Sequence, residues 1–170
     1  MNQISIRIII KKFKPTRKLK KVTLILLTLL FFIIACSDNQ TQTSDNLNWT
    51  TDLGKAIETA KAENKAVLVN FTGSDWCHWC FKLSDEVFSQ DEFKEYAYEN
   101  LILVKVDFPR SIPQSNETKA YNQSLAQKFG VRGFPTIIII NSQGNPVAKT
   151  GYQAGGAGNY INHIKSFLGN

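Results

Sequence analysis

A pair of cysteines two residues apart is the feature that most constrains this chain of 170 residues. Cys77 and Cys80 follow the apolar run 66–71, and the residues after them change to a helical pattern. A cysteine at the start of a helix meets unpaired backbone N–H groups and the positive end of the helix dipole, which favour a thiolate over a thiol. The second cysteine lies one turn further on and can close a small disulfide ring. This spacing predicts a redox centre at a strand-to-helix junction.

A zinc site and a structural disulfide are the two alternatives for a C-x-x-C pair. A zinc site needs two more ligands at suitable spacing, but the chain has no second C-x-x-C, and its only histidines are His78 and His163. A structural disulfide more often joins distant segments, because closing so short a loop constrains the unfolded chain very little. Redox chemistry is therefore the favoured interpretation, with no metal ligand expected and no cofactor other than the Cys77–Cys80 disulfide.

The first 35 residues are expected to be an export signal that is not part of the fold. Residues 1–21 carry eight Lys or Arg and no acid, and residues 22–35 form an apolar run with only two polar residues. A basic segment, a short apolar segment and a small residue before the cleavage point are typical of a signal peptide. The apolar run is shorter than the ~20 residues that a membrane-spanning helix needs. An uncleaved N-terminal anchor is the alternative.

The end of this segment, Ile33-Ile34-Ala35-Cys36, resembles the lipobox of bacterial lipoproteins, although its first position is usually Leu. In that family the signal is cut before the cysteine, and the cysteine is lipidated. The resemblance implies a lipoprotein-type signal peptide over 1–35, a lipidated Cys36 with a polar linker over 36–48, and a domain over 49–170. The domain would then be lipid-anchored in the bacterial cell envelope and face the periplasm or the exterior.

The basic net charge of the chain comes from the expected signal. The whole chain has 20 basic and 14 acidic residues, but 12 basic residues remain once the eight in the signal are removed. A mature part with a small net negative charge does not have the electrostatic footprint of a nucleic-acid-binding protein. We therefore expect no nucleic-acid partner.

Apolar periodicity predicts alternating helices and strands in the rest of the chain. Asp52 is a plausible helix N-cap, residues 89–92 match a capping box, and Gly130 fits a position just past a helix end. Helices are expected over 53–63, 77–88, 90–99, 117–129 and 157–168, and strands over 66–71, 101–106, 136–140 and 146–150. This order predicts an α/β fold with a central mixed β-sheet flanked by helices on both faces.

This order and two motifs resemble the thioredoxin family over residues 49–168. The motifs are Trp76-Cys77-His78-Trp79-Cys80 and Gly133-Phe134-Pro135-Thr136, and the first looks most like exported thioredoxin-like proteins with W-C-x-W-C sites. The resemblance implies a thioredoxin-like fold in which the bond before Pro135 is cis and Pro135 faces the disulfide.

The resemblance also implies roles for individual residues. Cys77, expected to be the more exposed sulfur, would be the attacking thiolate, and Cys80 would resolve the mixed disulfide. A protonated His78 would add to the stabilisation of the thiolate. The residues expected to support the pair are Trp76, His78, Trp79 and Pro135, and those expected to bind substrate are Phe134 and Pro135.

One position departs from the family pattern. Thioredoxin has a buried aspartate on its central strand that helps to move the proton of the resolving cysteine, and the nearest match here is Asn70, which cannot take a proton. Asp75 lies beside the site, and Lys105 matches the family's lysine near that aspartate. The departure bears on proton transfer and on the direction in which the enzyme works best.

The leading hypothesis is a membrane-tethered, extracytoplasmic thiol–disulfide oxidoreductase that reduces disulfides of exported proteins or apocytochromes. Its partners would be protein disulfide or thiol substrates and a transmembrane electron donor, because the only Gly-rich stretch, 155–158, does not follow a strand as a dinucleotide-binding motif would. One alternative is a copper-binding or copper-delivery module that uses both cysteines and one histidine. The other is a tethered holdase that uses the Phe134–Pro135 groove.

Overall fold

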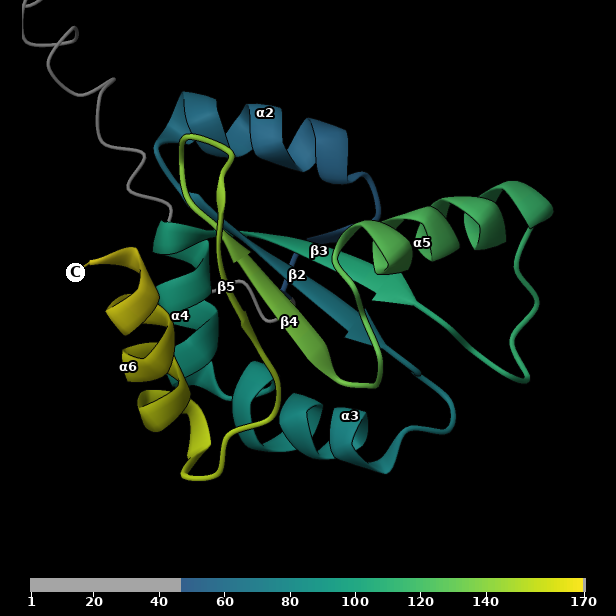
Figure 1. Ribbon diagram of the computed structural model, residues 1–170. Helices are drawn as coiled ribbons and strands as arrows, with labels where there is room; N and C mark the ends of the chain where they lie inside the picture. Colours follow the sequence, from purple (N-terminus) through teal and green to yellow (C-terminus); the bar gives the residue numbers. More distant parts are fainter. Residues whose placement is uncertain (1–46, 170) are drawn as a thin grey trace, which may run out of the picture. The chain divides into compact units, whose positions relative to one another are not determined.

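The computed structural model of the protein describes residues 47–169 (Figure 1). The expected signal peptide, Cys36 and most of the expected linker lie outside these residues. Within the described part, no helix is both long and apolar enough to cross a membrane. In chain order the elements are β1 (Trp49–Thr50), α2 (Leu53–Glu63), β2 (Ala66–Thr72), α3 (His78–Leu83), η1 (Ser84–Phe88), α4 (Asp91–Asn100), β3 (Leu101–Asp107), α5 (Asn116–Lys128), β4 (Thr136–Ile140), β5 (Pro146–Thr150) and α6 (Gly156–Leu168).

The five strands form one mixed sheet in the order β1-β3-β2-β4-β5. The pairs β1–β3 and β2–β3 are parallel, whereas β2–β4 and β4–β5 are antiparallel. All seven residues of β2 are buried, as expected for a strand at the centre of a sheet that is covered on both faces. The prediction of a mixed α/β sheet is confirmed.

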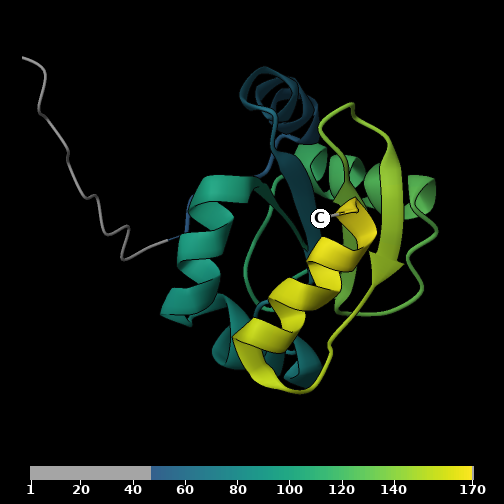
Figure 2. The same ribbon diagram turned by 90° about the vertical axis from the view of Figure 1, so that its left-hand side faces the viewer.

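Helices cover both faces of the sheet, as predicted (Figures 1 and 2). Alternate residues of β2 point to opposite faces, because the side-chain period of a strand is two. Leu68 packs with residues of α3, η1, α4 and α6, and α4 lies against α6 on this face. Val67, Val69 and Phe71 pack on the other face with residues of α2 and α5.

Two predicted helix boundaries are confirmed by their local hydrogen bonds and backbone angles. Asp52 caps α2, since its Oδ1 accepts a hydrogen bond from the Lys55 N–H at 3.0 Å. Gly130 follows the end of α5 with φ of +59°, the left-handed conformation that glycine adopts without a steric penalty.

The prediction of a capping box at residues 89–92 is wrong. Helix α4 begins at Asp91, with Gln90 at the N-cap and no side-chain hydrogen bond there. Ser89 instead ends the preceding helix: its backbone N–H donates to the Ser84 carbonyl at 2.8 Å, and its hydroxyl donates to the Asp85 carbonyl at 2.6 Å. The hydroxyl is therefore engaged one turn back and cannot cap the next helix.

Two further features were not predicted. The segment expected to be one helix over 77–88 divides into α3 and the π-helical turn η1, which inserts one extra residue per turn. Strand β1 has two residues, too few to produce a periodic pattern, and forms because Trp49 and Thr50 pair with Leu103 and Val104 of β3. The other element bounds differ from the predicted ones by at most one residue.

Candidate redox site

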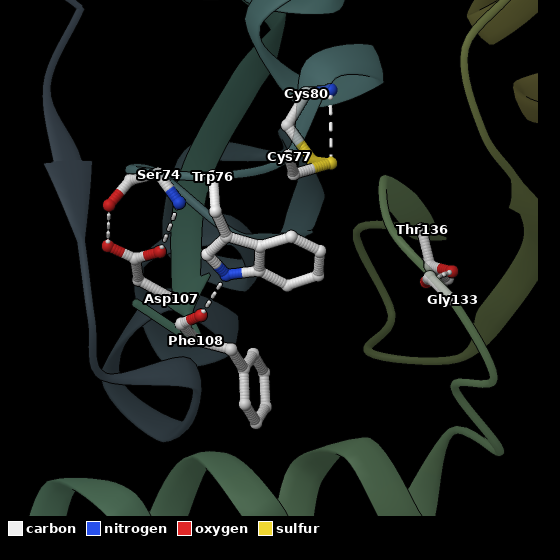
Figure 3. Close-up of a disulfide and its surroundings, with 8 residues drawn as sticks. All are labelled: Ser74, Trp76, Cys77, Cys80, Asp107, Phe108, Gly133 and Thr136. Atoms are coloured by element: carbon white, nitrogen blue, oxygen red, sulfur yellow. Dashed lines mark hydrogen bonds between the residues drawn. A yellow bond between two sulfur atoms is a disulfide. The ribbon is translucent and has the colours of Figure 1, made fainter. Parts of the chain in front are cut away.

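Cys77 and Cys80 form a disulfide at the end of the sheet (Figure 3). Strand β2 ends at Thr72, a four-residue segment follows, and Cys77 is the N-cap residue of α3. The two Cα atoms are 5.2 Å apart, within the usual range for a disulfide. The structure therefore brings the two predicted sulfurs together at a strand-to-helix junction.

The sulfur of Cys77 takes the place of a capping oxygen at the start of α3. The Cys77 backbone is extended, with φ of −87° and ψ of 103°, and its Sγ accepts a hydrogen bond from the Cys80 N–H at 3.2 Å. A backbone N–H directed at a sulfur, at the positive end of a helix, stabilises negative charge on that sulfur. The geometry suits a thiolate at Cys77 once the disulfide is opened.

The expectation that Cys77 is the more exposed cysteine is wrong for the disulfide form. Cys77 is 5% exposed and Cys80 is 6% exposed. Both residues are therefore buried to the same degree while the disulfide is closed. A difference in reactivity between them must therefore come from the helix-start position of Cys77.

The Phe134–Pro135 bond is cis, as the family resemblance implies. Strand β4 begins immediately afterwards, where Thr136 pairs with Phe71 of β2. The turn over 133–135 therefore lies at the same end of the sheet as the disulfide, and Figure 3 shows Gly133 and Thr136 across from Trp76. The Thr136 hydroxyl donates to the Gly133 carbonyl at 2.7 Å and closes this turn.

Trp76 lies between the disulfide segment and the turn that contains Pro135. Its Nε1 donates to the Phe108 carbonyl at 2.8 Å, and its ring meets the Phe134 ring edge-on with centroids 5.8 Å apart. The indole also lies against Gly73, where an added Cβ would come within 2.5 Å of the ring. Residue 73 must therefore lack a side chain for Trp76 to occupy this position.

Hydrogen bonds to two acidic residues connect the segment 73–76 with the end of β3 and the loop that follows it. The carboxylate of Asp107 accepts hydrogen bonds from the Ser74 N–H at 2.9 Å and the Ser74 hydroxyl at 2.5 Å. The carboxylate of Asp75 accepts from the backbone N–H groups of Arg110, Ser111 and Ile112, with shortest distances of 2.9, 2.6 and 3.3 Å. We call this second arrangement the Asp75 clamp.

The hydrogen bond from the Arg110 N–H is the main cause that lowers the pKa of Asp75 below its ordinary value, and those from residues 111 and 112 add to it. A group whose pKa is lower in the folded state stabilises the fold above its unfolded pKa and loses that effect as pH falls through the folded pKa. We expect the amide protons of 110–112 to lose hydrogen-exchange protection below pH about 4, where a free Asp takes up its proton.

Hydrogen exchange followed by NMR across this pH range tests the clamp, and Asp75→Asn is the control. The variant should show low protection of the three amides at neutral pH and no further acid-dependent change. Equal protection of the three amides in Asp75→Asn and in the native protein at neutral pH would contradict the clamp as the origin of loop order.

Asn70 and Lys105 lie next to each other on the paired strands β2 and β3, so Lys105 faces an amide at the position where thioredoxin has its buried aspartate. Asn70 is buried, and its Oδ1 has no hydrogen-bond partner within residues 47–169. The register places it opposite Lys105 of β3. The Lys105 Nζ lies 3.9 Å from Asp107 Oδ2. Asp107 was not predicted as a site residue, although its position at the carboxyl end of a strand could have indicated that it lies near the disulfide.

His78 and Trp79, the two residues between the cysteines, are exposed, and Trp79 is 51% exposed. The Trp79 ring lies 5.3 Å from the ring of Tyr152, and the Lys82 Nζ lies over both rings. The Tyr152 hydroxyl donates to Glu86, which ties the segment after β5 to the turn η1. The contacts of Tyr152 with Trp79 and Glu86 were not predicted from the sequence.

His163, the other candidate for a metal ligand, lies in α6. Its Nε2 shares a hydrogen bond of 2.9 Å with the Thr150 hydroxyl. In the described part of the chain, no three or more His, Cys, Asp or Glu side chains come together in a group that could hold a metal ion.

Comparison with known proteins identifies relatives that carry similar domains. A family model described as a thioredoxin-like domain matches residues 53–158. The disulfide bond reductase DsbH of Chlamydia pneumoniae is 38% identical over 123 residues, which cover 72% of this chain and 74% of the relative. The thioredoxin-related protein DsbJ of the same organism is 27% identical over 135 residues, which cover 79% of this chain but 38% of DsbJ.

The solved structure of a DsbH oxidoreductase has a TM-score of 0.69 and 35% sequence identity, and the match covers 79% of this chain and 92% of that one. A thioredoxin from Thermus thermophilus has a TM-score of 0.53 at 17% identity, with 71% and 85% covered, and shares the fold.

Proposed function

This chain belongs to the thioredoxin-like family and is a thiol–disulfide oxidoreductase, and we propose that it acts outside the cytoplasm as a membrane-tethered reductase of protein disulfides. The observation that carries the proposal is the Cys77–Cys80 disulfide at the start of α3, at the same end of the sheet as the cis Phe134–Pro135 bond. The similarity to a relative named as a disulfide bond reductase supports the reducing direction.

In the proposed reaction the reduced protein begins with a Cys77 thiolate and a Cys80 thiol. The thiolate attacks one sulfur of the substrate disulfide, a mixed disulfide forms, and the other substrate sulfur leaves as a thiolate and takes up a proton. The Cys80 sulfur then gives up its proton and attacks the Cys77 sulfur, which releases the second substrate sulfur as a thiolate that also takes up a proton. The substrate gains two electrons and becomes a dithiol, and the pair in the protein is oxidised to the disulfide.

The turn that contains Pro135 would receive the substrate segment. Pro135 has no N–H, and the backbone of Phe134 would pair with an extended polypeptide as an added strand. The half-buried ring of Phe134 lies against Trp76, the residue before Cys77, and this contact joins the proposed groove to the reactive sulfur. Trp76, His78 and Trp79 would support the pair.

Repeated turnover requires a source of two electrons to reduce the Cys77–Cys80 disulfide. A thiol donor that carries electrons across the membrane would supply them, and protein disulfides would accept them. Redox titration of the pair against glutathione tests the direction. A potential of about −270 mV supports a reductase, and one of about −120 mV contradicts the proposed direction and favours an oxidase.

The tether proposal rests on the basic segment 1–21, the apolar run 22–35 and the cysteine that follows. Cleavage before Cys36 and lipidation of its sulfur would leave the domain attached to the membrane of a bacterial envelope by a polar linker. We expect mass spectrometry of the membrane-bound protein to show a lipid-modified Cys36 at its N-terminus. Cys36→Ala should give a soluble or unprocessed form. An intact segment 1–35 on the membrane-bound protein would contradict the proposal.

A further inference from the structure

Arg110 carries a positive charge close to the proposed site of disulfide exchange. Its guanidinium carbon lies 3.8 Å from the centre of the Trp76 ring, within the range of a cation–π interaction. Trp76 directly precedes Cys77, and its ring also meets the ring of Phe134, which directly precedes Pro135. A polypeptide segment that lies along Phe134 with a sulfur at Cys77 would therefore pass near Arg110.

The fold sets the position of Arg110 through the loop that carries it. The Asp75 clamp accepts the N–H of Arg110 itself and those of the two residues after it. On the other side, the Phe108 carbonyl accepts the indole N–H of Trp76. Pro109 and Pro113 limit the backbone freedom of the loop, because a proline ring fixes φ. The loop therefore holds Arg110 against the same indole that lies beside the disulfide.

The charge of Arg110 is not neutralised by an acid in the described part of the chain. None of the ion pairs found among residues 47–169 includes it, and its guanidinium donates no hydrogen bond there. Asp75 contacts the same loop, but the hydrogen bonds that its oxygen atoms accept there come from backbone N–H groups. Arg110 is exposed, so its five N–H donors are open to a ligand that comes from solvent.

We propose that Arg110 is a specificity-determining residue that binds an aspartate or glutamate carboxylate of the substrate close to its disulfide. A guanidinium is suited to this ligand, because its planar fork of donors matches the two oxygens of a carboxylate. The inference rests on the proposed reductase function and adds the class of substrate: polypeptide disulfides with acidic neighbours.

The test uses three disulfide peptides of equal length that carry Glu, Gln or Lys beside one cysteine. The full-length protein, reduced and held in an uncharged detergent, reacts with each peptide, and Trp fluorescence in a stopped-flow instrument gives the second-order rate constant. Each value is divided by the rate constant for the reaction of the same peptide with dithiothreitol, which corrects for the intrinsic reactivity of the peptide disulfide. We expect the Glu peptide to react about two- to fivefold faster than the Gln peptide, the range that an exposed ion pair supports.

Arg110→Gln should bring the three corrected rates together, and Arg110→Lys, which keeps the charge, should retain part of the preference. The matched control is Lys119→Gln, which removes one exposed positive charge from α5 and should keep the native preference. In about 1 M salt, where the screening length falls to about 3 Å, the native preference should shrink.

Two results would overturn the assignment. In the first, the Arg110→Gln protein still prefers the Glu peptide. In the second, Arg110→Gln slows the reaction with all three peptides equally, which would mean that the charge acts on the Cys77 thiolate and not on the substrate. Failure of the native protein to reduce any of the three peptides would instead count against the proposed function, so the two failures are distinguishable.

Discussion

Replacement of Cys77 by serine is expected to reduce disulfide reduction to the rate of the protein-free reaction. The attacking group in thiol–disulfide exchange is a thiolate, and a serine hydroxyl does not ionise near neutral pH. Cys80→Ser should have a different result. Its Cys77 thiolate can still attack, but no second sulfur is present to resolve the product, so a mixed disulfide between Cys77 and the substrate should accumulate.

Insulin reduction with dithiothreitol as the electron source measures the first effect, and mass spectrometry under non-reducing conditions detects the mixed disulfide. Cys36→Ser is the matched control, since it removes the remaining cysteine of the chain without touching the pair. Mixed disulfides formed through Cys80 in the Cys77→Ser protein would reverse the assigned roles. Prevention of aggregation of an unfolded protein by all three variants alike would favour the holdase alternative.

Phe71→Ala is expected to lower the free energy of unfolding by about 3–5 kcal/mol, the usual cost of removing a large buried aromatic side chain. Phe71 lies on the central strand β2, is 0% exposed, and meets the ring of Phe129 at 5.9 Å. This loss is severe, because the free energy of unfolding of a typical protein is only about 5–15 kcal/mol. Phe71 also pairs with Thr136 directly after Pro135, so the loss would disturb the site.

Urea unfolding followed by circular dichroism measures this change. Phe81→Ala is the matched control: the same chemical change is made on α3 at a side chain that is 47% exposed, so we expect a change within about 0.5 kcal/mol. Equal losses for the two variants would contradict the placement of Phe71 in the core.

Local sequence patterns predicted much of this fold because the free energies behind them are local. The apolar run at 66–71 became the buried strand β2, since such a run stabilises a strand only when both faces are covered. Asp52 and Gly130 mark helix ends through hydrogen bonds and backbone angles that involve residues a few positions away. The C-x-x-C spacing at a strand-to-helix junction likewise predicted a disulfide that closes within one turn.

Other features depend on contacts between distant segments. Strand β1 exists because β3 supplies its partner, and Ser89 bonds to Asp85 because the preceding helix continues through a π-helical turn. The nearly equal burial of Cys77 and Cys80 is a property of the packed structure, and helix position alone does not reveal it.

The sequence by itself determined the pair of cysteines, the helix start that favours a thiolate and the proline of the opposing turn. Only the tertiary structure decided what surrounds them. Asp75 and Arg110 are 35 residues apart, and they meet because the parallel pairing of β2 with β3 brings the ends of both strands to one edge of the sheet. In the sequence alone, Asp75 is a carboxylate two residues before Cys77 whose partners are not visible. Three backbone N–H groups from another loop make it a clamp, because hydrogen-bond partners depend on distance in space and not on separation along the chain.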